Sequence, residues 1–333
     1  MVEFLFFRHG ETDWNVQKRF QGHTDIRLNE KGMQQAQLLS DKVRHWKPDV
    51  ILSSDLTRAF HTAEYCQMEW RVPLIQSADL REMHLGEAEG LHRDEVMKLV
   101  GPDMWKKWLG HEEKDEAFQF PKGETKAQAR NRVLRFLERF AKENPRYKRI
   151  AVSTHGGVLK RVTHGLPGVP PEGVPIPNCI TYRLNFDGYK WIYLPVRERA
   201  SGIVLSDNQI LTFHAIDPNS MREYHFLPGG KIEEAEGILQ CVTRETLEET
   251  GYHVSPLEPI LTSEYDFHWN GQDVWCRTHF VRADLISDFK NPEKVQDADY
   301  NKGVKWIPAH DLGSYFHYND SIFESVRKLT SKS

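Results

Sequence analysis

Three short apolar runs in the first half of the chain each end in a small group of polar residues. Residues 2–7 run into Arg8-His9-Gly10, residues 50–53 into Ser54-Asp55, and residues 150–153 into Thr154-His155-Gly156. Apolar runs of this length are typical of buried strands, and helix-forming sequence separates them. Strands that alternate with helices predict an α/β fold with a mostly parallel sheet, whose ligand site lies beyond the carboxyl ends of the strands.

The length of 333 residues favours two domains over one. We expect helices of the first domain at residues 28–44, 56–66 and 131–143, and a closing edge hairpin at residues 181–193. The boundary then falls between residues 194 and 195. After it, the expected strands are residues 200–205, 209–214, 278–283 and 304–307, and the expected helices are residues 235–250 and 321–329. This pattern predicts an α+β domain over residues 195–333.

Composition and charge exclude several classes of protein. Hydrophobic residues make up 39% of the chain and charged residues 28%, which is typical of a folded globular protein rather than a disordered one. The net charge of −4 gives no reason to expect nucleic acid as a partner, and no stretch is long enough for a membrane span. The cysteines form no C-x-x-C pair, which predicts free thiols in a reducing cytoplasm; they are Cys66, Cys179, Cys241 and Cys276.

The polar residues after the strands have the chemistry of a phosphate site. A neutral imidazole of His9 can attack phosphorus and carry a phosphoryl group, and the adjacent Arg8 can neutralise phosphate oxygens. Arg58 and His155 supply further donors. The leaving oxygen needs an acid, for which Glu82 is the candidate. Each residue taken singly is more often structural, but together they predict phosphoryl transfer.

Five segments in order resemble the histidine phosphatase superfamily, which has the phosphoglycerate-mutase-like fold. They are Arg8-His9-Gly10 with Asn15, residues 20–28, residues 53–59, the segment around Glu82, and residues 154–157. The resemblance covers residues 1–194 and implies a three-layer domain with no cofactor. It implies that His9 is the nucleophile and Glu82 the proton donor. The groups implied to hold or border the phosphate are Arg8, Arg58, His155, Asn15, Gln21, Thr24 and Gly156.

The acid segment favours a phosphatase over a mutase. Mutases of this superfamily carry Glu-Arg-His-Tyr-Gly there, and the Arg and Tyr engage the second half of the substrate. This chain has Glu82-Met83-His84-Leu85-Gly86 instead. Further along, the segment Trp105-Lys106-Lys107-Trp108 either lines the substrate end of the pocket or belongs to a solvated amphipathic helix.

Three glutamates in the second half of the chain share one helix face. Glu245, Glu248 and Glu249 are spaced by three and four residues, which places them on one side of an α-helix. Neighbouring carboxylates repel one another, and a solvated acidic face would normally contain Lys as well. A cation that prefers oxygen ligands, Mg²⁺ or Mn²⁺, explains the cluster better, since it would bridge phosphate oxygens and activate a water.

The spacing around these glutamates resembles the Nudix box, Gly-x5-Glu-x7-Arg-Glu-U-x-Glu-Glu-x-Gly-U, in which U is apolar. Every fixed position from Gly230 to Gly251 is matched, and the departures are Thr246 and Tyr252 at U positions. The resemblance implies a metal-dependent Nudix pyrophosphohydrolase over residues 195–333. The implied metal ligands are Glu245, Glu248, Glu249 and the carbonyl of Gly230. Of these, Glu248 and Glu249 are also implied to be catalytic. Arg244 is implied to orient a carboxylate and to pair with Glu236.

Outside the box the sequence leaves two questions open. A further acid is expected before the strand that contains Trp306, and its candidates are Glu293, Asp297 and Asp299. An aromatic stretch either stacks on a nucleotide base or packs the core as an ordinary strand; it contains Tyr265, Phe267, His268 and Trp269.

The hypothesis for the whole chain is a bifunctional hydrolase of small phosphorylated metabolites, in particular nucleotides. One site would hydrolyse phosphomonoesters through a phosphohistidine at His9. The other would cleave the pyrophosphate bond of a nucleoside triphosphate, or of a nucleoside diphosphate linked to another group. The alternatives are a mutase-type first domain, and a chain in which one domain only senses nucleotide for the other. A role in RNA 5′-end processing is disfavoured by the lack of a strongly basic composition.

Overall fold

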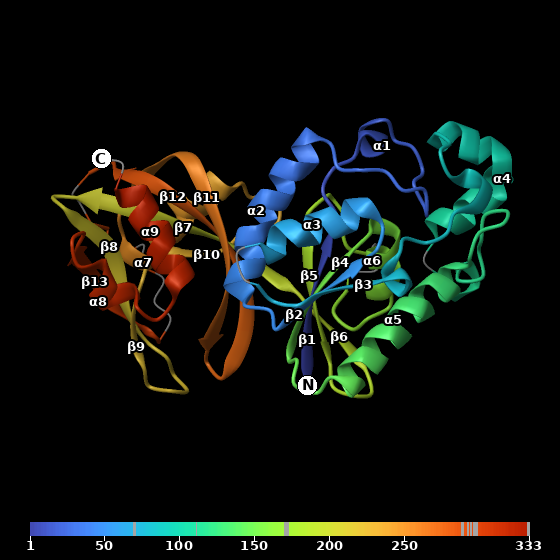
Figure 1. The fold of residues 1–333 in the computed structure, drawn as a ribbon. Coiled ribbons are helices and arrows are strands. Elements are labelled where there is room, and N and C mark those ends of the chain that lie inside the picture. The colour runs from blue at the N-terminus through green and yellow to red at the C-terminus, as the bar shows by residue number, and fades with distance from the viewer. Residues whose placement is uncertain are drawn as a thin grey trace. The chain divides into compact units, whose positions relative to one another are not determined.

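The chain forms two compact units, Met1–Pro195 and Val196–Ser333 (Figure 1). The computed structural model describes residues 1–68, 71–110, 112–169, 173–287, 290–291, 293, 295 and 299–331. Within these residues, no helix is both long and apolar enough to cross a membrane.

The first unit is built on a sheet with the strand order β3-β2-β4-β1-β5-β6. Four neighbouring strands are parallel: β1 (Val2–Arg8), β2 (Val50–Ser54), β3 (Leu74–Ser77) and β4 (Arg149–Thr154). The hairpin of β5 (Thr181–Phe186) and β6 (Trp191–Leu194) adds to β1 in the antiparallel sense. The sheet is therefore mostly parallel, as the sequence predicted.

Helices cover both faces of this sheet because alternate residues of its central strands point to opposite sides. Phe4 and Phe6 pack in one core with α5 (Lys126–Glu143) and α6 (Gly156–Thr163). Leu5 and Phe7 pack in another with α2 (Glu30–Trp46) and α3 (Thr57–Gln67). The first unit thus has the expected three layers. The short α1 (Asp13–Val16) and the longer α4 (Arg93–Leu109), which is broken at Gly101, lie in the connections between strands.

Helix α5 begins five residues earlier than the predicted residue 131. The Thr125 side chain accepts a hydrogen bond from the backbone N–H of Gln128 and so caps the helix at its start. Its first turn is polar apart from Ala127 and Ala129, so the apolar periodicity that marks a helix in the sequence becomes visible only later.

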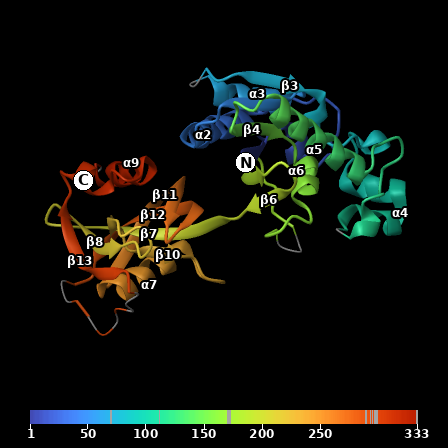
Figure 2. The ribbon, with the colours of Figure 1, turned by 90° about the horizontal axis from the view of Figure 1, so that it is seen from below.

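The second unit is built on a mixed sheet with the order β11-β12-β7-β8-β13. Its strands are β7 (Val196–Ser206), β8 (Gln209–Ile216), β11 (Val254–Trp269), β12 (Gln272–Leu285) and β13 (Asn301–Pro308). The short β9 (Glu223–Phe226) pairs with β8, and β10 (Gly229–Lys231) pairs with β7. Figure 2 shows α7 (Ile238–Thr250) and α9 (Asp320–Thr330) on opposite sides of these strands, and the short α8 (Leu312–Phe316) packs in the same core as α9.

Helix α7 carries the spaced glutamates and begins three residues later than predicted. Its N-cap is Gly237, and Ala235 has a φ of 64°, which is incompatible with a right-handed helix. Glu236 therefore lies in the loop before the helix. At the other end, Gly251 adopts a φ of 78° and ends the helix in the left-handed conformation that favours glycine.

Candidate active sites

The first candidate site forms where β1 and β4 end side by side. These strands are parallel and pair Arg8 with Thr154, so the residues that follow both strands meet at one edge of the sheet. The rings of His9 and His155 consequently lie 5.2 Å apart between centroids. The backbone N–H of Gly10 donates to Thr62 at 3.1 Å, which fixes the loop after β1.

His9 is held in one tautomer. Its Nδ1 lies 2.7 Å from the carbonyl oxygen of Gly10, which can only accept, so Nδ1 carries the proton. No described residue hydrogen-bonds to Nε2, which leaves its lone pair available. Burial, followed by the charges of Arg58 and Arg8, lowers the pKa of His9 well below its ordinary value. The imidazole is therefore neutral, as a nucleophile must be.

Two guanidinium groups and a second imidazole near His9 have buried nitrogen atoms that are still unpaired. Among the described residues, Nε of Arg8, Nε of Arg58 and Nδ1 of His155 are buried and have no hydrogen-bond partner. The remaining nitrogens hold the side chains in place: Arg58 donates to the carbonyls of Gly22 and Thr24, and Nε2 of His155 lies 2.9 Å from Ser54 Oγ. Unpaired buried donors of this kind suit an anion.

Glu82 reaches the same cavity from the loop after β3. Its two carboxylate oxygens accept hydrogen bonds from the backbone N–H groups of Gly157 and Val158, at 2.8 and 2.9 Å. These amides belong to the first turn of α6, where the helix dipole favours a negative charge. Arg132 steadies the loop by donating to the carbonyls of Asp79, Arg81 and Glu82.

Two of the three residues expected near the phosphate line the cavity, and the third does not. Asn15 and Gln21 both line it and both hydrogen-bond to Thr12. Thr24 is outside the described lining, and its hydroxyl donates to Glu89 at 2.8 Å. The structure therefore places Thr24 as a support for the loop around Arg58, which corrects the expectation that it borders the phosphate.

The sequence analysis missed several residues that organise this site. Glu89 accepts hydrogen bonds from the backbone of His23, Thr24 and Leu85. Asn178 donates to the backbone carbonyl of His9, 169 residues away along the chain. Glu89 belongs to the sequence Gly86-x-x-Glu89-Gly90, which is similar to the phosphatase branch of the superfamily, but that pattern did not indicate its role. Asn178 is marked by no local motif, because a contact across the fold brings it to the site.

The two tryptophans of residues 105–108, in α4, have different surroundings. Trp108 lines the cavity together with Lys160 and Arg161 of α6, neither of which the sequence analysis identified. Trp105 is buried in the core of the connection with Phe118 and Phe120. Of these two tryptophans, only Trp108 is among the residues that line the cavity.

The second candidate site lies on α7. A single guanidinium, that of Arg244, bridges three carboxylates: it donates to Glu236 at 2.8 Å, to Glu245 at 2.8 Å and to Glu248 at 3.0 Å. The pairing of Arg244 with Glu236 agrees with the sequence prediction. Within the described residues, no three His, Cys, Asp or Glu side chains are arranged so that together they could hold a metal ion.

Glu249 is the most enclosed of the spaced glutamates. Burial, the backbone hydrogen bond from Gly229 and the nearby charge of Glu245 act on its carboxyl group, and burial dominates, which raises the pKa to about 8. Glu245 lies against the backbone of Gly230, where any β-carbon would collide with its carboxylate. Gly230 is therefore required by the close approach of an acidic side chain to the loop before α7.

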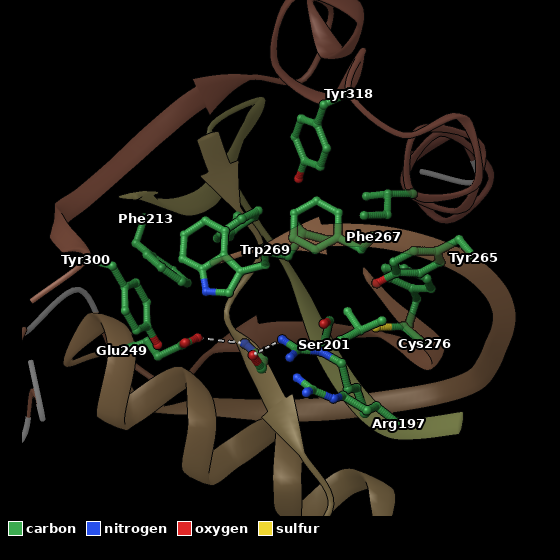
Figure 3. Close-up of a pocket in the computed structure, with 17 residues that line it drawn as sticks. Arg197, Ser201, Phe213, Glu249, Tyr265, Phe267, Trp269, Cys276, Tyr300 and Tyr318 are labelled. Atoms are coloured by element: carbon green, nitrogen blue, oxygen red, sulfur yellow. Dashed lines mark hydrogen bonds between the residues drawn. The ribbon is translucent and has the colours of Figure 1, made fainter. Parts of the chain in front are cut away.

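Glu249 also closes one end of a pocket with aromatic walls (Figure 3). Tyr265, Phe267 and Trp269 of β11 point into this pocket because alternate residues of a strand face the same side. His268 does not line it and instead pairs with Asp273 at 2.7 Å on the exposed side. Of the four residues in the aromatic stretch, His268 is therefore the one that does not face this pocket. The pocket is completed by Phe213, Phe226, Tyr300, Tyr318, Arg197, Arg199 and Ser201, among others.

The two described candidates for a further acid do not line this pocket. Glu293 and Asp299 are exposed and are not among the pocket's lining residues, and Asp297 lies outside the described residues. At the box positions that depart from the pattern, Thr246 is fully buried, and Tyr252 packs edge-on against Trp306 at 5.8 Å.

Comparison with known families matches both units. The model described as the histidine phosphatase superfamily (branch 1) matches residues 4–198, and the model described as the NUDIX domain matches residues 196–328.

Named relatives match the first unit over most of their own length. The chain is 32% identical over 196 residues to phosphoglycerate mutase-like protein 4 of Arabidopsis thaliana, which covers 57% of this chain and 82% of the relative. It is 30% identical over 195 residues to the uncharacterized phosphatase PhoE of Bacillus subtilis, which covers 57% of this chain and 92% of the relative. A solved mycobacterial glucosyl-3-phosphoglycerate phosphatase superposes with a TM-score of 0.52 at 23% identity, covering 58% of this chain and 96% of that structure, so it supports the fold.

Proposed function

The chain belongs to the histidine phosphatase superfamily and carries a NUDIX domain in its second half, and we propose that it is a bifunctional phosphohydrolase. The first site would hydrolyse phosphomonoesters and the second would hydrolyse a pyrophosphate bond. The observation that carries the first activity is the neutral, tautomer-fixed His9 beside the guanidinium groups of Arg8 and Arg58, whose buried Nε atoms are unpaired among the described residues. The second rests on the acidic face of α7 beside an aromatic pocket.

In the first reaction, Nε2 of His9 attacks the phosphorus as the ester P–O bond breaks. Arg8, Arg58 and His155 bind the phosphoryl oxygens through the nitrogen atoms that are otherwise unpaired. The departing alkoxide takes a proton from the carboxyl group of Glu82. Water then attacks the phosphohistidine while Glu82 accepts its proton, so that His9 and Glu82 return to their starting states and inorganic phosphate leaves.

A trapping experiment tests the covalent step. We expect a peptide containing His9 to gain the mass of one phosphoryl group when turnover is stopped in alkali, where phosphohistidine survives. The His9→Ala variant should gain none. Steady turnover with no phosphorylated His9 peptide at any quench time would contradict the mechanism.

Hydrolysis rather than phosphoryl relocation is favoured by the acid segment. The residues after Glu82 are Met83, His84 and Leu85, which offer neither a guanidinium nor a phenol to a second half of the substrate. The relatives bear both kinds of name, phosphatase and mutase-like. Incubation with a phosphorylated hydroxy acid separates the two: a phosphatase releases inorganic phosphate, whereas a mutase yields the positional isomer without loss of phosphate.

The second site suits a hard divalent cation such as Mg²⁺ or Mn²⁺. The donors available are the carboxylates of Glu245, Glu248 and Glu249 and the carbonyl of Gly230, all oxygen atoms of the kind these ions prefer. Such an ion would polarise the phosphate oxygens and favour deprotonation of an attacking water. Arg244 would hold Glu245 and Glu248 in position through its two ion pairs with them. Glu248 and Glu249 are the candidates to accept the proton of the attacking water.

The aromatic pocket favours a nucleoside on one side of the bond that is cleaved. Trp269 and Phe267 both line the pocket and are stacked with an interplanar angle of 18°, so two flat faces of its wall are aligned. A planar base gains from such faces. The substrate proposed is a nucleoside triphosphate or a nucleoside diphosphate linked to another group.

Neighbouring residues of β11 provide a matched test of the nucleoside. Trp269 points into the pocket, whereas His268 points out of it. Loss of one stacking partner should raise KM for a nucleoside substrate about 10-fold in Trp269→Ala, with His268→Ala close to wild type. Equal KM values in both variants, or turnover of pyrophosphate esters that lack a base at the same kcat/KM, would exclude the nucleoside. Tight nucleotide binding without any turnover would instead support the sensor alternative.

A further inference from the structure

The cavity around His9 carries more positive charge than one phosphoryl group needs. Arg8 and Arg58 flank the nucleophile, and Lys160 and Arg161 line the same cavity from α6. Among the lining residues that the structure describes, Glu82 alone carries a carboxylate. A substrate with one phosphate would therefore leave cationic side chains in the cavity without a counter-charge.

Arg161 is the most unusual of these cations because it is buried and unpaired. Its side chain is 2% exposed, and its Nε has no hydrogen-bond partner within the described residues. No ion pair joins it to any carboxylate of that part of the chain. Its guanidinium lies over the ring of Trp108, 5.1 Å from the ring centroid. A buried guanidinium without an acid is costly, so packing alone does not explain its position.

The helix dipole does not account for it either. Lys160 and Arg161 lie in the last turn of α6, where a cation is favoured. A solvent-exposed residue would gain this benefit without the cost of burial. Burial is the largest influence on Arg161 and lowers its pKa to about 10, although the charges of Glu116, Glu82 and Asp115 act in the opposite direction.

The position of Arg161 along α6 sets its distance from the phosphoryl group. Helix α6 begins at Gly156, where a β-carbon would lie 3.2 Å from Nε of Arg8. Five residues further along, Arg161 is displaced by about 7.5 Å along the helix axis, at 1.5 Å per residue. Because Arg161 lines the same cavity from this position, it can contact a part of the substrate other than the phosphoryl group.

We propose that Arg161 binds a second anionic group of the phosphatase substrate, a carboxylate or a second phosphate, carried a few bonds from the phosphoryl group that is removed. Trp108 holds the guanidinium flat at that end of the cavity, and Lys160 adds to the positive charge there. This assignment rests on the proposed phosphatase activity and makes Arg161 a specificity-determining residue.

A series of three-carbon phosphomonoesters tests the assignment. The three esters end in a hydroxyl, a carboxylate or a second phosphate and are otherwise alike. In the wild-type chain, kcat/KM for at least one anionic ester should exceed that of the hydroxyl ester by about 10-fold or more, the gain from a hydrogen bond to a charged group. The anionic ester with the higher kcat/KM identifies the anion, carboxylate or phosphate, that Arg161 binds.

Variants then assign the preference to Arg161. Arg161→Met keeps much of the length of the side chain and should bring the ratio of anionic to neutral ester close to one, while Arg161→Lys should retain part of it. The control is Arg146→Met, because Arg146 also lies over an aromatic ring, that of Tyr147 at 4.7 Å, but is exposed and outside the cavity. If Arg161→Met slows all three esters equally, its role is structural and the proposal fails.

Binding measurements keep this inference separate from the proposed activity. The three esters are titrated calorimetrically into the His9→Ala chain, in which no phosphoryl transfer is expected. Tighter binding of an anionic ester that disappears in His9→Ala combined with Arg161→Lys or Arg161→Met supports the proposal, whatever the turnover of the wild type. Equal affinities for all three esters would overturn it. Absence of hydrolysis by the wild type, in contrast, would overturn only the phosphatase activity.

Discussion

The carboxylate of Glu82 accepts a hydrogen bond from the backbone N–H of Gly157 at 2.8 Å, and the missing side chain of Gly157 leaves room for it. A β-carbon on Gly157 would lie 2.5 Å from Oε1 of Glu82. The glycine therefore determines where the candidate proton donor sits relative to His9.

Substitution of this glycine should disable the acid while the fold survives. In Gly157→Ala the methyl group displaces the Glu82 carboxylate, and a displacement of the order of 1 Å costs about 100-fold in kcat. The measurement is phosphomonoesterase kcat together with the melting temperature. Gly313→Ala serves as the control, since a β-carbon there has no atom within 4 Å among the described residues. A Gly157→Ala enzyme with wild-type kcat would remove Glu82 from the mechanism.

The two activities should be separable by single substitutions. His9→Ala is expected to abolish phosphomonoesterase activity and to leave pyrophosphate-bond cleavage unchanged, because the two sets of residues belong to different compact units. Glu248→Gln or Glu249→Gln should have the opposite effect. Product analysis by chromatography on each variant measures both rates. Loss of both activities in His9→Ala would mean that one site performs both reactions.

Chelation should divide the activities in the same way. EDTA is expected to stop pyrophosphate-bond cleavage, and Mg²⁺ or Mn²⁺ to restore it, since the acidic face of α7 needs a cation to bind phosphate. The phosphomonoesterase should persist in EDTA, because Arg8 and Arg58 already provide the positive charge. Rates before and after dialysis against EDTA are compared, and a phosphomonoesterase that EDTA inactivates would contradict the assignment of the first site.

The charge state of His9 gives a prediction for pH. Its pKa is lowered in the folded chain by burial and by Arg58 and Arg8, so it stays neutral below its ordinary value of 6.5. As the pH falls, His9 is protonated in the unfolded chain before it is protonated in the folded chain. The free energy of unfolding should therefore be greatest above pH 6.5 and should decrease as the pH falls towards the lowered pKa of His9. Unfolding by denaturant at pH 8 and pH 5.5 should show a smaller loss for His9→Ala than for wild type. Nitrogen NMR of the chain with labelled histidine measures the protonation of His9 directly. A His9 resonance that titrates near pH 6.5 would refute the lowered pKa.

Local geometry explains what the sequence alone predicted correctly. The alternation of strands and helices predicted the layered first domain, and helical spacing placed Glu245, Glu248 and Glu249 on one face of α7. Asn29 caps α2 and Gly251 ends α7, in agreement with the preferences of these residue types at helix ends. These features depend on residues close in sequence, where the regular backbone fixes the distances.

Contacts between distant segments could be decided only by the tertiary structure. The sequence grouped His268 with Trp269, but the pairing of β11 with β12 determined which face lines the pocket. It did not identify Arg161, because Trp108 lies on another helix more than fifty residues earlier in the chain. The hydroxyl of Thr24 likewise donates a hydrogen bond to Glu89, which belongs to a loop distant in the sequence. A motif records which side chains are present, whereas packing across the core decides which of them face the same cavity and which charges remain there unpaired.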